Sequence, residues 1–114
     1  YSISASKRDT IDLLSRDNRP TAIICGNDIL ATGAIYGATA AGLSVPSDVS
    51  ITGIGDFKGS KEMEPALTTV RIPARSIGAR AGEHIVRLIA RAEREIVREE
   101  FPLQLMARAS SSVV

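Results

Sequence analysis

The sequence has 114 residues, 44% hydrophobic and 24% charged, with a formal net charge of +1. Such a charge produces no overall field that would attract nucleic acid or an anionic membrane. The single cysteine excludes an internal disulfide, and no apolar tract reaches the ~20 residues that span a bilayer. Because the chain starts at Tyr1 with no initiator methionine, signal peptide or basic leader, we expect a piece of a larger protein.

A helix is expected first, ending before Pro20. Residues 6–9 (SKRD) are similar to a capping box, with Asp in the acidic place. Ile11, Leu14 and Leu13 then supply a short apolar stripe. We interpret this element as a surface helix packed on a sheet.

An apolar strand is predicted over residues 22–25 (AIIC), between Pro20 and Gly26. The run is too short for a helix, and its lack of polar residues indicates a strand covered on both faces. Cys25 ends this strand, and we interpret its thiol as a small hydrophobic group.

The next helix is expected from Ile29 to about Ala41, with Gly42 just past its end. Asn27 and Asp28 are favoured helix-start residues and stand where the chain leaves the strand.

Gly33 and Gly37 lie on one face of this helix and would let a neighbouring backbone come close. The other face carries Thr32, Ile35 and Tyr36, and is apolar enough to meet a second subunit. The pattern is equally consistent with an intramolecular core.

A turn over residues 45–48 leads to a second strand over residues 49–54. Two apolar strands joined by one helix form a βαβ unit, in which ligands bind at the carboxyl ends of the strands. These ends are residues 26–28 (GND) and 53–56 (GIGD). The glycines from Gly53 onward do not fit a dinucleotide-binding motif, because the third glycine falls one place late.

Residues 57–65 are expected to form a charged, solvated loop, and residues 67–71 (LTTVR) a third strand. A long helix should then run from Pro73 to about Arg94. Its arginines alternate with glutamates, which indicates a solvated amphipathic helix rather than a nucleic-acid surface. Its apolar stripe consists of Ile77, Ala81, Ile85 and Leu88.

The C-terminal stretch 99–108 should be extended, with Pro102 favouring an edge strand. We expect the polar tail 110–112 (SSS) to be frayed. His84 has no neighbouring carboxylate or cysteine at metal-ligand spacing, so we interpret it as an ordinary helix-surface histidine. The sequence therefore predicts no catalytic residue, no metal site and no cofactor, and we do not expect an enzyme.

Four motifs together resemble the C-terminal part of a LacI/GalR-family transcriptional regulator: PTAIICGNDILATGA, AAGLSVPSDVSITGIGD, PALTTVRIPARSIGARA and LQLMARASS. The resemblance covers nearly the whole chain. It implies a periplasmic-binding-protein-like α/β effector domain, a three-layer αβα fold with a mostly parallel sheet, in which two lobes enclose a small ligand. It also implies a cytoplasmic homodimer that binds operator DNA through a helix-turn-helix domain not in this chain.

By the same resemblance, residues 1–72 would be most of the C-terminal lobe. Residues 73–97 would be a crossover helix that normally packs on the N-terminal lobe, and residues 98–114 a returning strand and tail. Without that lobe, we expect the apolar stripe of the helix, represented by Ile77, Ile85 and Leu88, to be exposed, repacked or buried by another copy of the chain.

The resemblance assigns ligand contact to Asn27, whose amide can donate to and accept from a hydroxyl. Capping the helix is the alternative for Asn27, and both roles are compatible. Asp28 is expected to cap the helix. Tyr1 falls where sugar-binding members carry an aromatic residue that stacks on the ligand.

The implied site has three further positions, of which two depart from the family pattern and one matches it. Gly55 stands where sugar-binding members have an aspartate, Asp56 matches a mainly structural aspartate, and Ile72 replaces a glutamine that contacts the ligand in some members. Loss of the carboxylate at Gly55 removes repulsion toward an anion. We therefore expect the effector to be an acidic metabolite such as a sugar acid rather than a neutral sugar.

The resemblance places the dimer surface near Thr32 and Ile35 on the central helix, with Met63 in the nearby loop. The alternative function is a periplasmic sugar-binding protein of a transport system, which would share the ligand cleft and lack the DNA-binding module.

Overall fold

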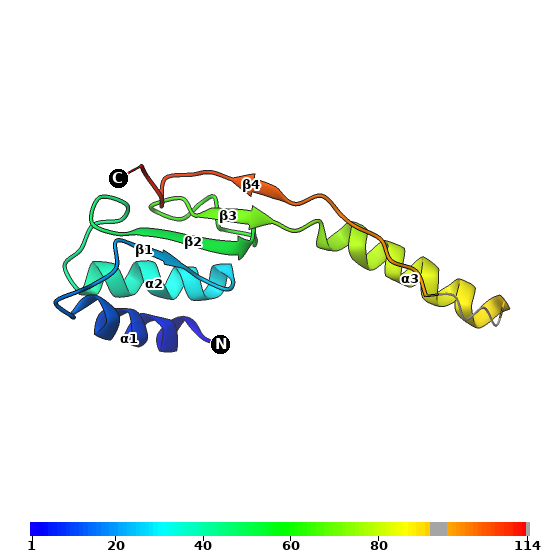
Figure 1. The fold of residues 1–114 in the computed structure, drawn as a ribbon, viewed down its shortest axis with the longest axis horizontal. Coiled ribbons are helices and arrows are strands. Elements are labelled where there is room, and N and C mark those ends of the chain that lie inside the picture. The colour runs from blue at the N-terminus through cyan, green and yellow to red at the C-terminus, as the bar shows by residue number, and fades with distance from the viewer. Residues whose placement is uncertain (92–95, 114) are drawn as a thin grey trace. The chain divides into compact units, whose positions relative to one another are not determined.

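The structure, a computed structural model, describes residues 1–91 and 96–113 of the chain (Figure 1). The chain divides into two compact units, Tyr1–Arg71 with Gln104–Val114, and Ile72–Leu103. The first unit contains two helices and four strands: α1 (Ile3–Leu14), β1 (Ala22–Ile24), α2 (Asp28–Ala40), β2 (Ser50–Gly55), β3 (Thr68–Arg71) and β4 (Gln104–Met106).

The four strands form one sheet in the order β1-β2-β3-β4. β1, β2 and β3 are parallel, and β4 pairs antiparallel with β3. The expected α/β class with a mostly parallel sheet is confirmed, as is the edge position of the last strand. Gly42, with a φ of 77°, follows the end of α2 as predicted.

Helix α1 begins earlier than the sequence pattern indicated. Its N-cap is Ser2, whose side chain accepts a 3.1 Å hydrogen bond from the Ala5 backbone N–H. The predicted capping box at residues 6–9 is therefore wrong. The hydroxyl of Ser6 instead donates a 2.7 Å hydrogen bond to the Leu30 carbonyl, because this side of α1 faces α2.

The predicted close approach at the two helix glycines is confirmed. A Cβ at Gly33 would lie 2.5 Å from the Ile3 carbonyl oxygen, and one at Gly37 would lie 2.7 Å from the Thr10 Cβ. Any side chain at either position would push α1 away from α2. The two glycines thus offset their helix-propensity cost, roughly 1 kcal/mol each, by allowing this packing.

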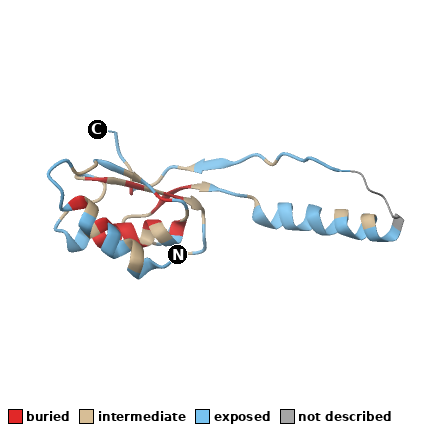
Figure 2. Ribbon diagram, turned by 60° about the horizontal axis from the view of Figure 1, so that its bottom comes forward, coloured by how far each residue is buried: buried red, intermediate tan, exposed pale blue. Residues whose placement is uncertain are grey.

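Both helices of the first unit lie on the same face of the sheet (Figures 1 and 2). Ile51 and Thr69 point to this covered face and are buried. Ile24 points to the opposite face and is 82% exposed. The prediction that the first strand is covered on both faces is therefore wrong for this chain, since no helix of the first unit lies over that side.

The core lies between α2 and the sheet, and α2 carries more buried residues than any other described helix or strand (Figure 2). Cys25 is buried in this core, as expected, and burial raises the pKa of its thiol to about 11. Ile35, predicted for a surface that meets a second subunit, is only 2% exposed and belongs to the same core. This corrects the prediction for Ile35, whose side chain is not available at the surface.

The serine tail is anchored, contrary to the prediction that it is frayed. Ser110 is fully buried between the beginnings of β2 and β3. Its hydroxyl donates a 2.6 Å hydrogen bond to the Ile51 carbonyl and accepts one of 2.8 Å from the Thr68 N–H. Ser111 adds a 2.8 Å contact to the Thr68 hydroxyl. Ser110 satisfies backbone groups of two strands and Ser111 contacts a side chain of one of them, so the polarity of this tail does not indicate solvent exposure.

The second unit contains α3 (Ala74–Arg91), and the predicted end of this helix near Arg94 lies outside the described residues. Ile77 and Ile85 are exposed, and Leu88 is partly buried. His84 is also partly buried, beside a cavity of about 260 Å³ that Val97 and Phe101 help to line. Its Nε2 is enclosed without a hydrogen-bond partner among the described residues, so the expectation of an ordinary surface histidine is corrected.

No described helix is both long and apolar enough to cross a membrane.

Candidate functional site

The carboxyl ends of β1 and β2 meet at one edge of the sheet, because the two strands are parallel neighbours (Figure 1). Asn27 and Asp28 follow β1, and Gly55 and Asp56 lie at the end of β2. The sequence prediction that these two motifs lie at the same edge is therefore supported by the topology.

Asn27 is the N-cap of α2. Its Oδ1 accepts a 2.9 Å hydrogen bond from the Leu30 N–H, which fixes the orientation of the side chain. The Nδ2 group makes no hydrogen bond to another described residue, and the side chain is partly exposed. One end of the amide is thus used for the helix cap, while the other can donate to a ligand hydroxyl or carboxylate.

Asp28 does not act as the helix cap. It is buried, and its Oδ1 accepts a 2.6 Å hydrogen bond from the Thr69 hydroxyl. Its Oδ2 accepts hydrogen bonds from the Phe57 N–H at 2.8 Å and from the Ser60 hydroxyl at 2.5 Å. The carboxylate therefore connects α2 to β3 and to the loop after β2, and the predicted capping role is corrected.

Gly55 adopts a φ of 131°, a conformation that residues with a side chain rarely adopt. The ring of Phe57 lies where a side chain of residue 55 would project. Backbone geometry and the aromatic ring thus account for glycine here. The absence of a carboxylate at Gly55 is consequently not evidence by itself for an anionic effector.

The Asp56 carboxylate is held by two arginines. Arg71 Nε donates to Oδ2 at 2.6 Å, and Arg108 Nη2 donates to Oδ1 at 2.7 Å. The side chain of Asp56 is only 9% exposed. Desolvation alone would raise its pKa, but the hydrogen bonds and charges of Arg108 and Arg71 outweigh it and hold the pKa below its ordinary value. Both carboxylate oxygens of Asp56 thus accept hydrogen bonds within the protein.

The ligand roles of the other two residues, Tyr1 and Ile72, stay predictions. Tyr1 is fully exposed, just before α1. Ile72 belongs to the second unit and is exposed.

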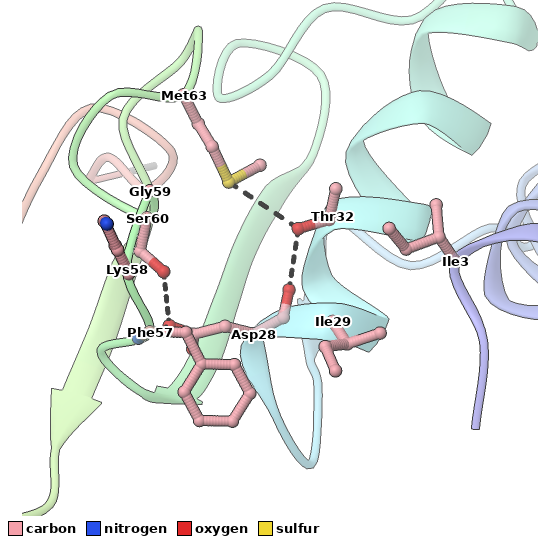
Figure 3. Close-up of a pocket in the computed structure, with 9 residues that line it drawn as sticks. All are labelled: Ile3, Asp28, Ile29, Thr32, Phe57, Lys58, Gly59, Ser60 and Met63. Atoms are coloured by element: carbon pink, nitrogen blue, oxygen red, sulfur yellow. Dashed lines mark hydrogen bonds between the residues drawn. The ribbon is translucent and has the colours of Figure 1, made fainter.

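Thr32 and Met63 line a cavity of about 220 Å³ beside the start of α2 (Figure 3). The Thr32 hydroxyl donates to the Asp28 carbonyl at 2.8 Å and lies 3.6 Å from the Met63 sulfur. Ile3 and Ile29 give the cavity an apolar rim. These two predicted interface residues are therefore in contact, whereas Ile35 is in the core.

Sequence reasoning missed Ser60, Thr69 and Arg108, which hold the two aspartates. A buried aspartate needs donors, but the donors come from positions up to 52 residues away, so no local pattern identifies them. Among the described residues, no group of three or more His, Cys, Asp or Glu side chains could hold a metal ion.

The sequence matches the family described as "Periplasmic binding protein-like domain" over residues 2–111. It is 39% identical over 99 residues to "HTH-type transcriptional repressor PurR" of Serratia proteamaculans, covering 86% of this chain and 29% of that protein. The chain thus spans less than a third of the length of this curated relative.

Solved structures with a similar fold include a LacI family transcriptional regulator from Enterococcus faecium with bound ribose. It superposes with a TM-score of 0.88 and 28% identity, over 98% of this chain and 41% of that one. The lac repressor dimer bound to operator and the anti-inducer ONPF superposes with a TM-score of 0.87 and 26% identity, over 96% and 38% of the two chains.

Proposed function

Because the chain belongs to the LacI/GalR family of transcriptional regulators, as part of the periplasmic-binding-protein-like effector domain, we propose that it is the ligand-sensing and dimerisation part of a DNA-binding regulator. The observation that carries the sensing role is the half-used amide of Asn27 at the sheet edge where β2 also ends. Such edges are the usual ligand sites of open parallel sheets.

The proposed mechanism is linkage between two binding events, without a chemical reaction. A small effector binds one arrangement of the two lobes better than another, and this preference changes the affinity for operator DNA. The effector class proposed is a sugar or sugar acid. Sugars are bound in similar structures, such as the ribose complex from Enterococcus faecium. As a DNA-binding transcriptional regulator, the protein would act in the cytoplasm.

Residues 1–72 are proposed to form most of the C-terminal lobe, which other parts of the parent protein complete. Two features of the first unit support this. In the described part of the chain, the outer edge of β1 pairs with no strand. The sheet face that carries Ile24 and Leu105 is also exposed. In a complete domain, an unpaired strand edge and an exposed apolar sheet face would both be unfavourable, because they leave backbone groups unpaired and apolar surface in contact with water.

The helix within residues 73–97 is proposed to cross to the N-terminal lobe, and residues 98–114 to return from it. The support is the exposed apolar surface of α3, which includes Ile77, Ile85 and Ile89. An amphipathic helix of this kind is stable in a globular protein only when its apolar face is packed. Burial of this face against a second copy of the chain is the alternative.

The dimer surface is proposed to include Thr32 and Met63, with the exposed ring of Tyr36 one turn farther along α2. The support is a mostly apolar cavity lined by α1, α2 and the loop after β2, of which α2 and the loop are joined by hydrogen bonds of Asp28. Ile35 is excluded from this surface because its side chain is buried in the core.

The experiment that tests the regulator proposal is a DNA-binding measurement on the complete parent protein. DNA sites would be selected from its own genome, and their affinity compared with and without a library of sugars and sugar acids. The proposal expects specific sites whose affinity changes with one metabolite. A periplasmic sugar-binding protein, the alternative function, would bind sugar but select no DNA site.

A further inference from the structure

A basic pocket of about 290 Å³ lies beside the carboxyl ends of β2 and β3. Its charged lining residues are Lys58, Lys61, Arg71, Arg108, Asp56 and Glu62. Four cationic and two anionic side chains leave a formal charge of +2 in a chain whose net charge is only +1.

Arg71 provides the free donors of the basic pocket. Its Nε is bonded to Asp56, but neither Nη group makes a hydrogen bond within the described residues. The Arg71 side chain is 47% exposed, so an incoming group can reach these donors. A guanidinium held at one end presents its planar fork in a fixed orientation, which suits a carboxylate or a phosphate.

The neighbouring carboxylate does not cancel this charge. Asp56 is shared between Arg71 and Arg108, so two positive charges face one negative charge. The second arginine is fixed more tightly, because its Nη1 also donates to the Leu67 carbonyl at 2.9 Å. Asp56 therefore orients Arg71 while leaving a net positive charge.

Two lysines in the loop between β2 and β3, Lys58 and Lys61, add positive charge to the pocket. Lys58 forms no ion pair with a described residue and also lines the cavity at Thr32 and Met63. Lys61 lies 3.5 Å from Glu62, but both side chains are largely exposed, and such a pair contributes little. Lys58 is thus available to a ligand in the pocket.

We propose that the basic pocket is an anion subsite that binds the carboxylate or phosphate group of a small metabolite. Arg71 and Lys58 are the main residues that would contact this group. This proposal deepens the proposed function. It rests on that function only in identifying the bound metabolite as the effector of the regulator. The sequence analysis expected an acidic effector because Gly55 lacks a carboxylate. In this proposal the preference for an anion comes from Arg71 and Lys58.

The test is a two-dimensional ¹H–¹⁵N NMR titration of the complete parent protein with inorganic phosphate and, separately, with D-gluconate. Sodium chloride keeps the ionic strength constant, because surface charges attract any anion weakly at low salt. We expect saturable shifts of the backbone amides of Lys58, Gly59 and Arg71 with at least one of the two anions. Arg71→Gln should weaken binding about tenfold, which is typical for loss of a charge-assisted hydrogen bond.

Arg16→Gln is the matched control, because Arg16 also forms an exposed ion pair with an aspartate, Asp12 on α1. It should leave the titration unchanged. Lys58→Gln provides a second variant that keeps the Asp56 ion pairs. Equal binding by wild type and Arg71→Gln, or no saturable shift with either anion, would overturn the proposal.

Neutral D-glucose separates this proposal from the sensor function. Shifts at Asn27 with glucose and none at Arg71 with the anions would leave the regulator proposal intact and refute the anion subsite. Anion binding at Arg71 in a parent protein that selects no DNA site would do the reverse.

Discussion

The Thr69 hydroxyl donates a 2.6 Å hydrogen bond to Oδ1 of Asp28, and so connects the interior of β3 to the first turn of α2. The same carboxylate receives two hydrogen bonds from the loop after β2. Asn27, the proposed ligand residue, directly precedes Asp28. Its position relative to the strand ends is therefore set by buried contacts and not by helix capping alone.

Replacing Asp28 should strongly destabilise the chain. Asp28→Ala leaves three donors at Phe57, Ser60 and Thr69 without their acceptor, which should cost about 3 kcal/mol of unfolding free energy. Urea denaturation monitored by circular dichroism would measure it. Asp12→Ala, which removes an exposed carboxylate from α1, is the control and should change stability by less than about 0.5 kcal/mol. Similar effects of both substitutions would contradict the role of Asp28.

Gly33→Ala should destabilise although alanine is the better helix former. The added methyl group would meet the Ile3 carbonyl and Ser6, so α1 must move away from α2. Gly78→Ala, within α3, is the matched control: apart from its chain neighbours and the backbone of its own helix, no heavy atom of the described residues lies within 4 Å of its Cβ position. It should raise helix stability by roughly 1 kcal/mol. Thermal unfolding of both variants checks the prediction, which fails if Gly33→Ala is as stabilising as Gly78→Ala.

The Asp56 cluster predicts a specific acid sensitivity. Its pKa is lower in the folded chain than the ordinary value of 3.8, so the carboxylate stabilises the folded state at pH values above about 3.8. This contribution is lost as the pH falls below 3.8 through the folded pKa. Asp56→Asn should therefore be less stable than wild type at pH 6, and the difference should shrink below pH 4. A difference that stays constant in unfolding measurements from pH 6 to pH 3 would refute this account.

The dimer proposal predicts that Thr32→Arg weakens self-association of the parent protein. An arginine in the cavity beside Met63 introduces bulk and charge where a second subunit is proposed to pack. Thr39→Arg is the control, because Thr39 also lies on α2 and its hydroxyl bonds the carbonyl four residues earlier, but Thr39 is exposed. Sedimentation velocity should show more monomer only for Thr32→Arg. An unchanged sedimentation coefficient would remove Thr32 from the interface.

Local sequence signals were sufficient for the strands, for the end of α2 at Gly42 and for the close helix contact at Gly33. These features depend on neighbours within a few residues or on steric demands that glycine reveals. Family resemblance then supplied the mostly parallel sheet and the family itself.

Contacts between distant residues account for what was mispredicted. Ser110 has the composition of a frayed tail, but its hydroxyl fits between two strands about 40 and 60 residues earlier. Asp28 has the position of a helix cap, but buried donors on β3 and in the loop capture its carboxylate. Gly55 is a local case, because its φ of 131°, which residues with a side chain rarely adopt, accounts for glycine without reference to the charge of a ligand.

The most direct test of the central claim is a thermal-shift screen of the complete parent protein and its Asn27→Ala variant against neutral sugars, sugar acids and purines. A ligand at a hundredfold excess over its dissociation constant stabilises the folded state by roughly 2.7 kcal/mol, which is readily detected. The account predicts that one metabolite class raises the melting temperature of the wild type and that Asn27→Ala loses most of this shift. A metabolite that stabilises both proteins equally, or the absence of any stabilising metabolite, would contradict ligand sensing at this sheet edge.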